Sequence, residues 1–300
     1  MTTIPADAVL SLLGAIDPWR WQAHPEVWFL VLAILALGWW AVRVIGPRVV
    51  PVGRPVATTF QRWTFVAATV LLLASADWPI HDIAEVHLYS VHMVQHMAIT
   101  FIVPPLYLLA TPAWLVRLLV LDGGVGSRVV RRMAHPVVAG VVFNALVATT
   151  HWSGVVQLSF ESGMFHYSLH LMLFLSALLM WVPVAAPIPE LRISLPGQMI
   201  YLFLMSIIPT IPAAWLTFAE GTVYKHYDDG FEMWGVSVQS DQQTAGLIMK
   251  LLGGFYLWGI IIVKFIGYSR IHHRDGQIMR PAEGRHLDLQ RRNAEAEPVE

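Results

Sequence analysis

Long apolar runs recur along the whole of this 300-residue chain, and they constrain its fold more than any other feature. A helix needs about 20 consecutive apolar residues to cross the hydrocarbon core of a bilayer, and several runs reach that length. Hydrophobic residues make up 56% of the chain and charged residues only 13%, which favours one membrane bundle over two soluble domains. The sequence therefore predicts an all-α, polytopic membrane protein.

The bundle is predicted to contain seven transmembrane helices and to occupy residues 1–268. The spans are expected at residues 27–45, 60–76, 87–110, 137–151, 165–184, 195–218 and 244–268. Two apolar stretches, 9–16 and 113–121, are too short to span and are expected at the membrane surface. The polar residues 269–300 are expected to form a mobile cytoplasmic tail, because so polar a segment buries too little apolar surface to fold.

Basic residues fall almost entirely on one side of the predicted bundle. Of the 19 Lys and Arg residues, all but Arg20, Lys225 and Lys250 lie in or beside the loops after spans one, three and five, or near or beyond the end of span seven. Because cytoplasmic loops carry an excess of Lys and Arg, the N-terminus is predicted outside and the C-terminus inside. The outer side then holds most of the acidic residues and histidines. Such a face suits an arriving cation and excludes nucleic acid, which needs a basic footprint.

Two pairs of histidines stand near the predicted outer ends of different spans. His92 and His96 lie on the third span, and His166 and His170 lie on the fifth. A spacing of four residues places two side chains on one helical face, about one turn apart. Ionisable side chains inside a span are costly, and two pairs at similar depth predict a metal ion held between the helices. The alternative is that these are interfacial histidines bonded to backbone, water or acidic neighbours.

Several further side chains are candidates at the same depth. His151 ends the fourth span and is predicted as a fifth ligand, or else as an interface anchor beside its tryptophan neighbour. Asp77 and Asp241 are predicted as possible ligands or as partners that orient a ligand imidazole, with helix stop and N-cap as the simpler roles. Met93 is a possible transient donor, whereas Lys250 is not a ligand because its charge would repel a cation.

The donor set narrows the choice of metal. The chain has no cysteine, so ligands must come from His, Met, Asp or Glu. Imidazole and thioether donors suit copper, with zinc as the alternative. Besides Met93, the candidate thioether donors are Met97, Met164 and Met172. No phosphate-binding glycine loop is present, so ATP-driven transport by this chain alone is not expected.

Three motifs together resemble the multi-span CtaG-type cytochrome c oxidase assembly factors of bacteria. They are YSVHMVQHMAITFIVPPLYLLATPAW at 89–114, the segment 151–183 with HWSGVVQLSF, HYSLH and MWVP, and DQQTAGLIM at 241–249. The residues at the family's motif positions are His92, His96, His151, His166, His170 and Asp241.

The resemblance implies seven spans in a bacterial cytoplasmic membrane and a role in maturing a heme-copper oxidase. It implies copper delivery to the catalytic subunit of the oxidase, with a copper chaperone on the outer side as a possible second partner. On this interpretation the chain is expected to be a metal-binding assembly factor rather than an enzyme.

Three other functions use the same residues. A zinc hydrolase would hold the ion and a water on three histidines, with Asp77 or Asp241 as general base. A heme b electron carrier would bind heme between one histidine of the third span and one of the fifth. A copper importer would use the prolines that interrupt spans three and six to shape a path inward.

Overall fold

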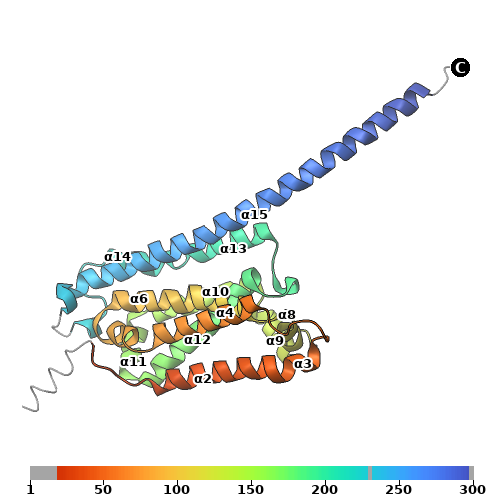
Figure 1. The fold of residues 1–300 in the computed structure, drawn as a ribbon. Helices are drawn as coiled ribbons and strands as arrows, with labels where there is room; N and C mark the ends of the chain where they lie inside the picture. The colour runs from red at the N-terminus through yellow and green to blue at the C-terminus, as the bar shows by residue number, and fades with distance from the viewer. Residues whose placement is uncertain (1–18, 229–231, 297–300) are drawn as a thin grey trace, which may run out of the picture.

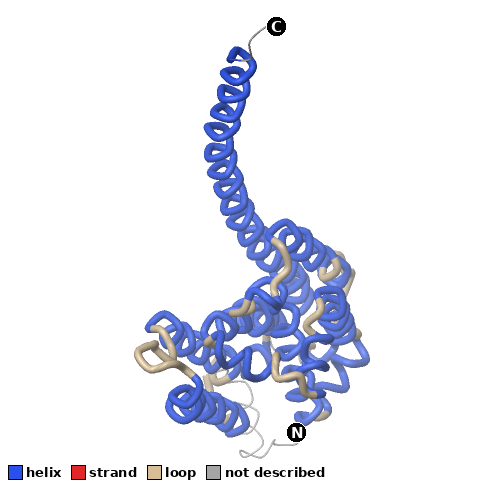
Figure 2. The backbone as a smooth tube through the Cα atoms, turned by 90° about the vertical axis from the view of Figure 1, so that its right-hand side faces the viewer, coloured by secondary structure: helices blue, strands red, loops and turns tan. Residues whose placement is uncertain are grey.

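The computed structural model describes residues 19–228 and 232–296, and these residues form helices and loops without any β-strand. The helices lie side by side in one bundle, joined by short loops at its two ends (Figure 1, Figure 2). The all-α prediction is therefore confirmed for this part of the chain. The apolar stretch predicted at the membrane interface, residues 9–16, lies outside the described residues.

Five helical segments are long and apolar enough to cross a membrane. They are Pro25–Val49 (α2, η1 and α3), Tyr89–Ala110 (α6, η3 and α7), Gly163–Ala185 (α12), Leu195–Thr217 (α13 and α14) and Val238–His273, the first part of α15. Each coincides with one of the predicted spans, which confirms the interpretation as a membrane protein. The side that faces the cytoplasm stays a prediction.

The other two predicted spans correspond to bent pairs of helices. Helix α4 (Thr59–Ala76) is followed at an angle of 45° by Ile80–His87, which comprises α5 and η2. Helix α9 (Val125–Met133) meets α10 (Pro136–Thr150) at 70°. A 15-residue helix such as α10 reaches only about 22 Å, which is short of the roughly 30 Å hydrocarbon core. The structure thus supports between five and seven spans.

The remaining elements are short. They are α8 (Ala113–Val120), α11 (Ser153–Glu161), η4 (Pro189–Leu191), η5 (Lys225–Tyr227) and η6 (Met233–Gly235). Helix α8 falls on the predicted surface segment 113–121. Helix α15 continues without a break from Val238 to Ala296 and extends away from the bundle (Figure 1). The mobility expected for residues 269–300 stays a prediction.

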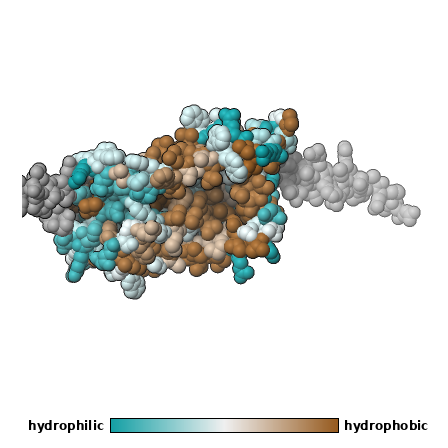
Figure 3. Space-filling model, turned by 90° about the horizontal axis from the view of Figure 1, so that it is seen from below, coloured by the Kyte–Doolittle hydropathy of each residue, from teal (hydrophilic) through white to brown (hydrophobic). Residues whose placement is uncertain are grey.

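The outer surface of the bundle has the pattern of a membrane protein. Hydrophobic residues form a broad band across the face in Figure 3, and hydrophilic residues gather beyond it. Large apolar side chains such as Phe29, Trp63, Phe255 and Val263 are exposed on the helices that form this surface. An exposed apolar area of this extent is stable only against lipid or another protein.

The prolines of the third span change its geometry without breaking it. Proline has no backbone N–H, so Pro104 leaves the carbonyl of Thr100, four residues earlier, without its helical donor. The indole Nε1 of Trp181, on α12, donates to that carbonyl at 2.9 Å. The turn before the prolines is a π-helix, η3 (Ala98–Ile102). The freed carbonyl therefore ties the third span to the fifth.

Helices α14 and α15 approach each other closely at a glycine. A Cβ atom at Gly246 would lie 2.7 Å from the carbonyl oxygen of Ala213 and 2.8 Å from the backbone nitrogen of Thr217. Backbone atoms cannot move aside as the end of a flexible side chain can. The contact therefore requires glycine at this position.

We expect Gly246→Ala to lower the free energy of unfolding by about 1–3 kcal/mol, the usual cost of overpacking a tight contact. The measurement is the apparent Tm of the detergent-purified protein. Gly259→Ala is the matched control, because Gly259 lies on the same helix with open space around it. An equal Tm for both variants would contradict the close approach of α14 and α15.

Candidate metal centre

Three histidines from two helices meet inside the bundle. His92 and His96 come from α6 and His170 from α12, and one ligand nitrogen of each lies within 4.8 Å of the others. The ring centroids of His92 and His96 are 4.3 Å apart, and that of His170 lies 5.6 Å from the first and 4.9 Å from the second. The predicted meeting of spans three and five is confirmed. We call these three residues the inner group.

The inner group is held in place by a carboxylate from the last span. Leu88, which precedes α6, has no side-chain acceptor for the free N–H groups at the start of that helix. Asp241 on α15 supplies both acceptors, taking hydrogen bonds from the backbone nitrogens of Tyr89 at 2.6 Å and Ser90 at 3.1 Å. Asp241 therefore caps α6 rather than its own helix. Both of its oxygens accept hydrogen bonds from backbone. Helix α15 begins at Val238, so the expectation that Asp241 is its N-cap is wrong. The role of Asp241 toward the imidazoles stays a prediction.

His166 falls in a different cluster from its sequence partner His170. One ligand atom of each of His81, Glu85 and His166 lies within 4.8 Å of the other two, and we call these residues the outer group. The two groups adjoin, because the ring centroids of His166 and His170 are 4.5 Å apart. His81 and Glu85 are not among the ligands predicted from the sequence. Their spacing of four residues was the available signal, but it lay outside the predicted spans.

His151 lies beside the inner group without joining it. Its Nδ1 donates to the carbonyl of Val147 at 2.7 Å, which leaves the lone pair on Nε2 as the free donor atom of the neutral ring. That Nε2 is buried and has no hydrogen-bond partner among the described residues. Burial raises the pKa of the Tyr224 phenol to about 12, so its hydroxyl stays protonated and donates to the His151 carbonyl at 2.8 Å. The role of His151 as a ligand stays a prediction.

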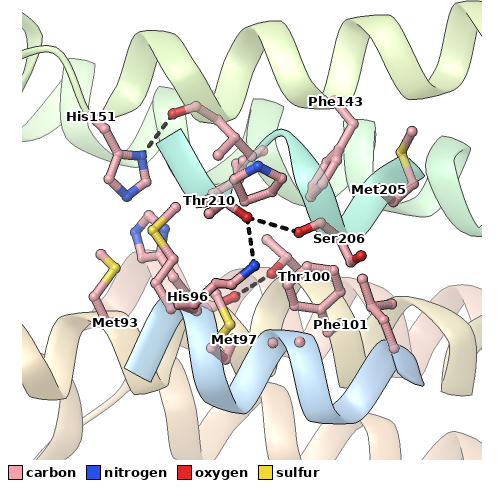
Figure 4. Close-up of a pocket in the computed structure, with 18 of the residues that line it drawn as sticks. Met93, His96, Met97, Thr100, Phe101, Phe143, His151, Met205, Ser206 and Thr210 are labelled. Carbon is pink, nitrogen blue, oxygen red and sulfur yellow. Dashed lines mark hydrogen bonds between the residues drawn. The ribbon is translucent and has the colours of Figure 1, made fainter. Parts of the chain in front are cut away.

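A pocket lined by thioethers adjoins the inner group. His96 and His151 point into it from two helices, with Met93, Met97 and Met205 around it (Figure 4). Met93 is fully buried there. This position is compatible with its predicted role as a transient donor near the histidines.

The other two predicted methionine donors are mostly exposed. Met164 is 81% and Met172 52% exposed, whereas the pocket is lined by other methionines. Thioethers at the surface of the bundle lie against its surroundings rather than at the buried histidines. Their predicted role as donors is thereby disfavoured.

Asp77 and Lys250 take other partners. The Asp77 carboxylate follows the end of α4 and accepts hydrogen bonds from Trp28 Nε1 and from the backbone nitrogen of Trp78, both at 2.9 Å. This favours the helix-stop interpretation. Lys250 lines the thioether pocket and donates to Thr210 Oγ1 at 2.7 Å, so it pairs with a hydroxyl rather than with an acid.

The inner group fits a metal ion because two of its ring nitrogens have no hydrogen-bond partner among the described residues. Within the described chain, His92 Nδ1 and His96 Nε2 are buried with no hydrogen bond. Leaving a buried polar atom unsatisfied costs about 1–3 kcal/mol. A fold that keeps two such atoms beside a third imidazole has a donor set typical of copper or zinc sites.

Comparison with known proteins gives one match. A family model described as "Cytochrome c oxidase caa3 assembly factor" matches residues 33–270, which includes the inner and outer groups and Asp241. No curated protein matches the chain. No solved structure matches it either.

The packing of α6 against α12 can be tested by crosslinking, because the chain has no native cysteine. We expect His92→Cys combined with His170→Cys to crosslink with a short thiol-reactive reagent, detected by mass spectrometry of the peptides. His92→Cys with Met172→Cys is the control, since Met172 is half-exposed on the same helix. Crosslinking of the control pair alone would show that α12 is rotated relative to this structure.

Removing the cap on α6 should destabilise the protein. Asp241→Ala leaves two buried backbone N–H groups without acceptors, and we expect the free energy of unfolding to fall by about 1–3 kcal/mol. The measurement is again the apparent Tm. Asp228→Ala, an exposed aspartate in the preceding loop, is the control and should leave Tm unchanged. An unchanged Tm for Asp241→Ala would mean that the carboxylate does not hold α6.

Proposed function

This chain belongs to the family of cytochrome c oxidase caa3 assembly factors, and from that premise we propose that it binds copper at the inner group and passes it to the oxidase. The observation that carries the proposal is the inner group itself. His92, His96 and His170 bring three imidazoles together from two helices, and two of them have a buried nitrogen that no protein group satisfies. Such a set gains its missing partner when an ion enters.

Copper suits this environment better than other ions. The three ligands are neutral imidazoles, so a monovalent ion leaves less uncompensated buried charge than a divalent one. Thioethers favour copper(I), and Met93 and Met97 lie next to His96 around the adjoining pocket. An exchange of imidazole for thioether ligands would let the ion leave as well as enter. Zinc is the alternative occupant.

The cellular setting follows from the same premise. The excess of Arg at one end of the bundle supports an orientation with the histidines near the outer face of a bacterial cytoplasmic membrane. The partner that receives copper is the catalytic subunit of a heme-copper oxidase. A soluble copper chaperone on the outer side is a candidate donor. The hydrophobic band in Figure 3 supports lipid as the surroundings of the bundle.

The competing functions fit the geometry less well. A hydrolase needs a free general base, but the oxygens of Asp77 and Asp241 already accept hydrogen bonds from an indole and from backbone. The histidine rings of α6 and α12 pack against one another, with centroids 4.9–6.2 Å apart, so a heme between them would have to displace this packing. An importer needs a continued path of ligands toward the Arg-rich end of the bundle. His135, at the start of α10, is exposed there rather than buried in such a path.

We expect His92→Ala combined with His170→Ala to lose one equivalent of copper relative to the wild type. Loss of two of three ligands should weaken the site by well over the tenfold that loss of a supporting contact costs. The measurements are copper per protein by mass spectrometry after loading, and the copper content of the oxidase in membranes that contain each variant. His135→Ala is the matched control, because this exposed histidine lies outside both groups.

The outcomes separate the candidates. Equal copper in the double variant and the wild type would contradict the inner group as the site. Zinc retained at the same residues would favour the hydrolase, and a heme absorption band would favour the electron carrier. Loss of copper from the variant with a normally metallated oxidase would refute delivery while leaving binding intact.

A further inference from the structure

A second cluster of potential ligands lies one helical turn from the inner group. It is the outer group, His81 and Glu85 from the segment after α4 together with His166 from α12. His166 is four residues nearer the start of α12 than His170, a distance of about 6 Å along the axis. The outer group thus lies between the inner group and the end of the bundle.

The Glu85 carboxylate lies between two imidazoles. Its Oε2 is 2.9 Å from His81 Nε2, and its Oε1 is 3.8 Å from His166 Nε2. Ligand atoms about 2.0–2.1 Å from a tetrahedral ion are roughly 3.3 Å from each other. The two observed separations bracket that value, so small side-chain rotations would place all three atoms around one ion.

The contact between His81 and Glu85 does not explain why His166, the third residue of the outer group, lies beside them. At 3.8 Å, His166 Nε2 is too far from Glu85 for a hydrogen bond, and among the described residues it has no other acceptor or donor. The His166 side chain is only 4% exposed. A buried ring nitrogen without a hydrogen-bond partner calls for an explanation, and a bound metal ion would supply the missing partner, as proposed for the inner group.

From this geometry we propose that the outer group is a second metal site, and that it binds a divalent transition-metal ion. The donor set is two imidazoles and one carboxylate, which differs from the all-imidazole inner group. A carboxylate is a harder, anionic ligand and therefore favours a divalent ion over copper(I). Asp82, next to His81 in sequence, has its Oδ1 3.0 Å from His24 Nε2, and its Oδ2 is buried without a hydrogen bond.

Access supports the same assignment. The Glu85 side chain is 28% exposed, whereas those of His81 and His166 are each only 4% exposed. An ion can thus meet the carboxylate first and the imidazoles afterwards. From there the inner group is adjacent, because His166 and His170 pack at 4.5 Å.

To bind an ion through Nε2, His81 must carry its ring proton on Nδ1 instead. Gln95 on α6 can accept the hydrogen bond from that proton. The Nε2 amide of Gln95 donates to His81 Nδ1 at 3.1 Å, so the ring proton is on Nε2. That Nε2 lies 2.9 Å from Glu85 Oε2 but has no hydrogen-bond partner among the described residues. The Oε1 atom of Gln95 is buried and unsatisfied within the described structure. A half-turn of this amide would let Nδ1–H donate to Oε1 and would free the Nε2 lone pair for the ion. Such a contact from outside the ligand set fixes the tautomer of a ligating histidine.

The experiment loads the full-length purified protein with Cu⁺ and then with Cu²⁺, and it measures total copper by mass spectrometry and Cu²⁺ alone by electron paramagnetic resonance. We expect two equivalents of copper in the wild type, of which one gives a resonance signal. Glu85→Gln should keep one equivalent without a signal, and His92→Ala/His170→Ala should keep one equivalent with a signal. Glu161→Gln is the matched control, an exposed glutamate on α11 outside both groups, and should retain two. Gln95→Leu should weaken the Glu85-dependent equivalent at least tenfold and leave the equivalent that gives no signal in place.

The contrary results are distinct. A wild type with one equivalent that Glu85→Gln retains would overturn the outer site. No copper at all in His92→Ala/His170→Ala would show that the outer group does not bind alone, which also overturns it. A single equivalent that depends on Glu85 but not on His92 and His170 would support the outer site and refute the proposed inner one. His81→Ala, with Tm measured for every variant, guards against misfolding of Glu85→Gln.

Discussion

The site depends most on the two hydrogen bonds that the Asp241 carboxylate accepts from the start of α6. The carboxylate joins the last span to the start of the third across more than 150 residues of sequence, and it satisfies N–H groups that Leu88 cannot. A negative charge at a helix N-terminus also interacts favourably with the helix dipole. Because His92 lies within one turn of these bonds, the depth and rotation of the inner group follow from them. At the other end of the same span, Trp181 donates to the Thr100 carbonyl freed by Pro104 and ties η3 to α12.

Buried ring nitrogens without hydrogen-bond partners distinguish the histidines of the inner group from ordinary histidines at a membrane interface. A histidine at a membrane surface normally bonds to water or to backbone, as His151 does through Nδ1. In the inner group the nitrogens face each other instead, and neutral imidazoles at 4–6 Å neither attract strongly nor satisfy one another. The membrane supplies no water to compensate. A metal ion at the inner group, as we propose, would supply the missing partners of these nitrogens.

The sequence predicted most of the helices and half of the site. Span positions follow from length and hydropathy, which are local, and the four-residue spacing of His92/His96 and of His166/His170 follows from helix geometry. The division of those four residues between two groups does not, because it depends on how the segment after α4 bends back to bring His81 and Glu85 beside His166. Asp241 illustrates the same limit. Its local context suggests an N-cap of its own helix, whereas its partners belong to a helix that is distant in sequence.

The order of donors along the bundle gives the two groups different chemistry. From the end of the bundle inward, a carboxylate with two imidazoles is followed by three imidazoles and then by a pocket with Met93 and Met97. Each step replaces a harder donor with a softer one and an anionic ligand with a neutral one. If both groups bind metal as we propose, a divalent ion should be favoured at the outer group and copper(I) deeper in the bundle. Lys250 at the pocket reinforces the trend, because its positive charge penalises a divalent ion more than a monovalent one.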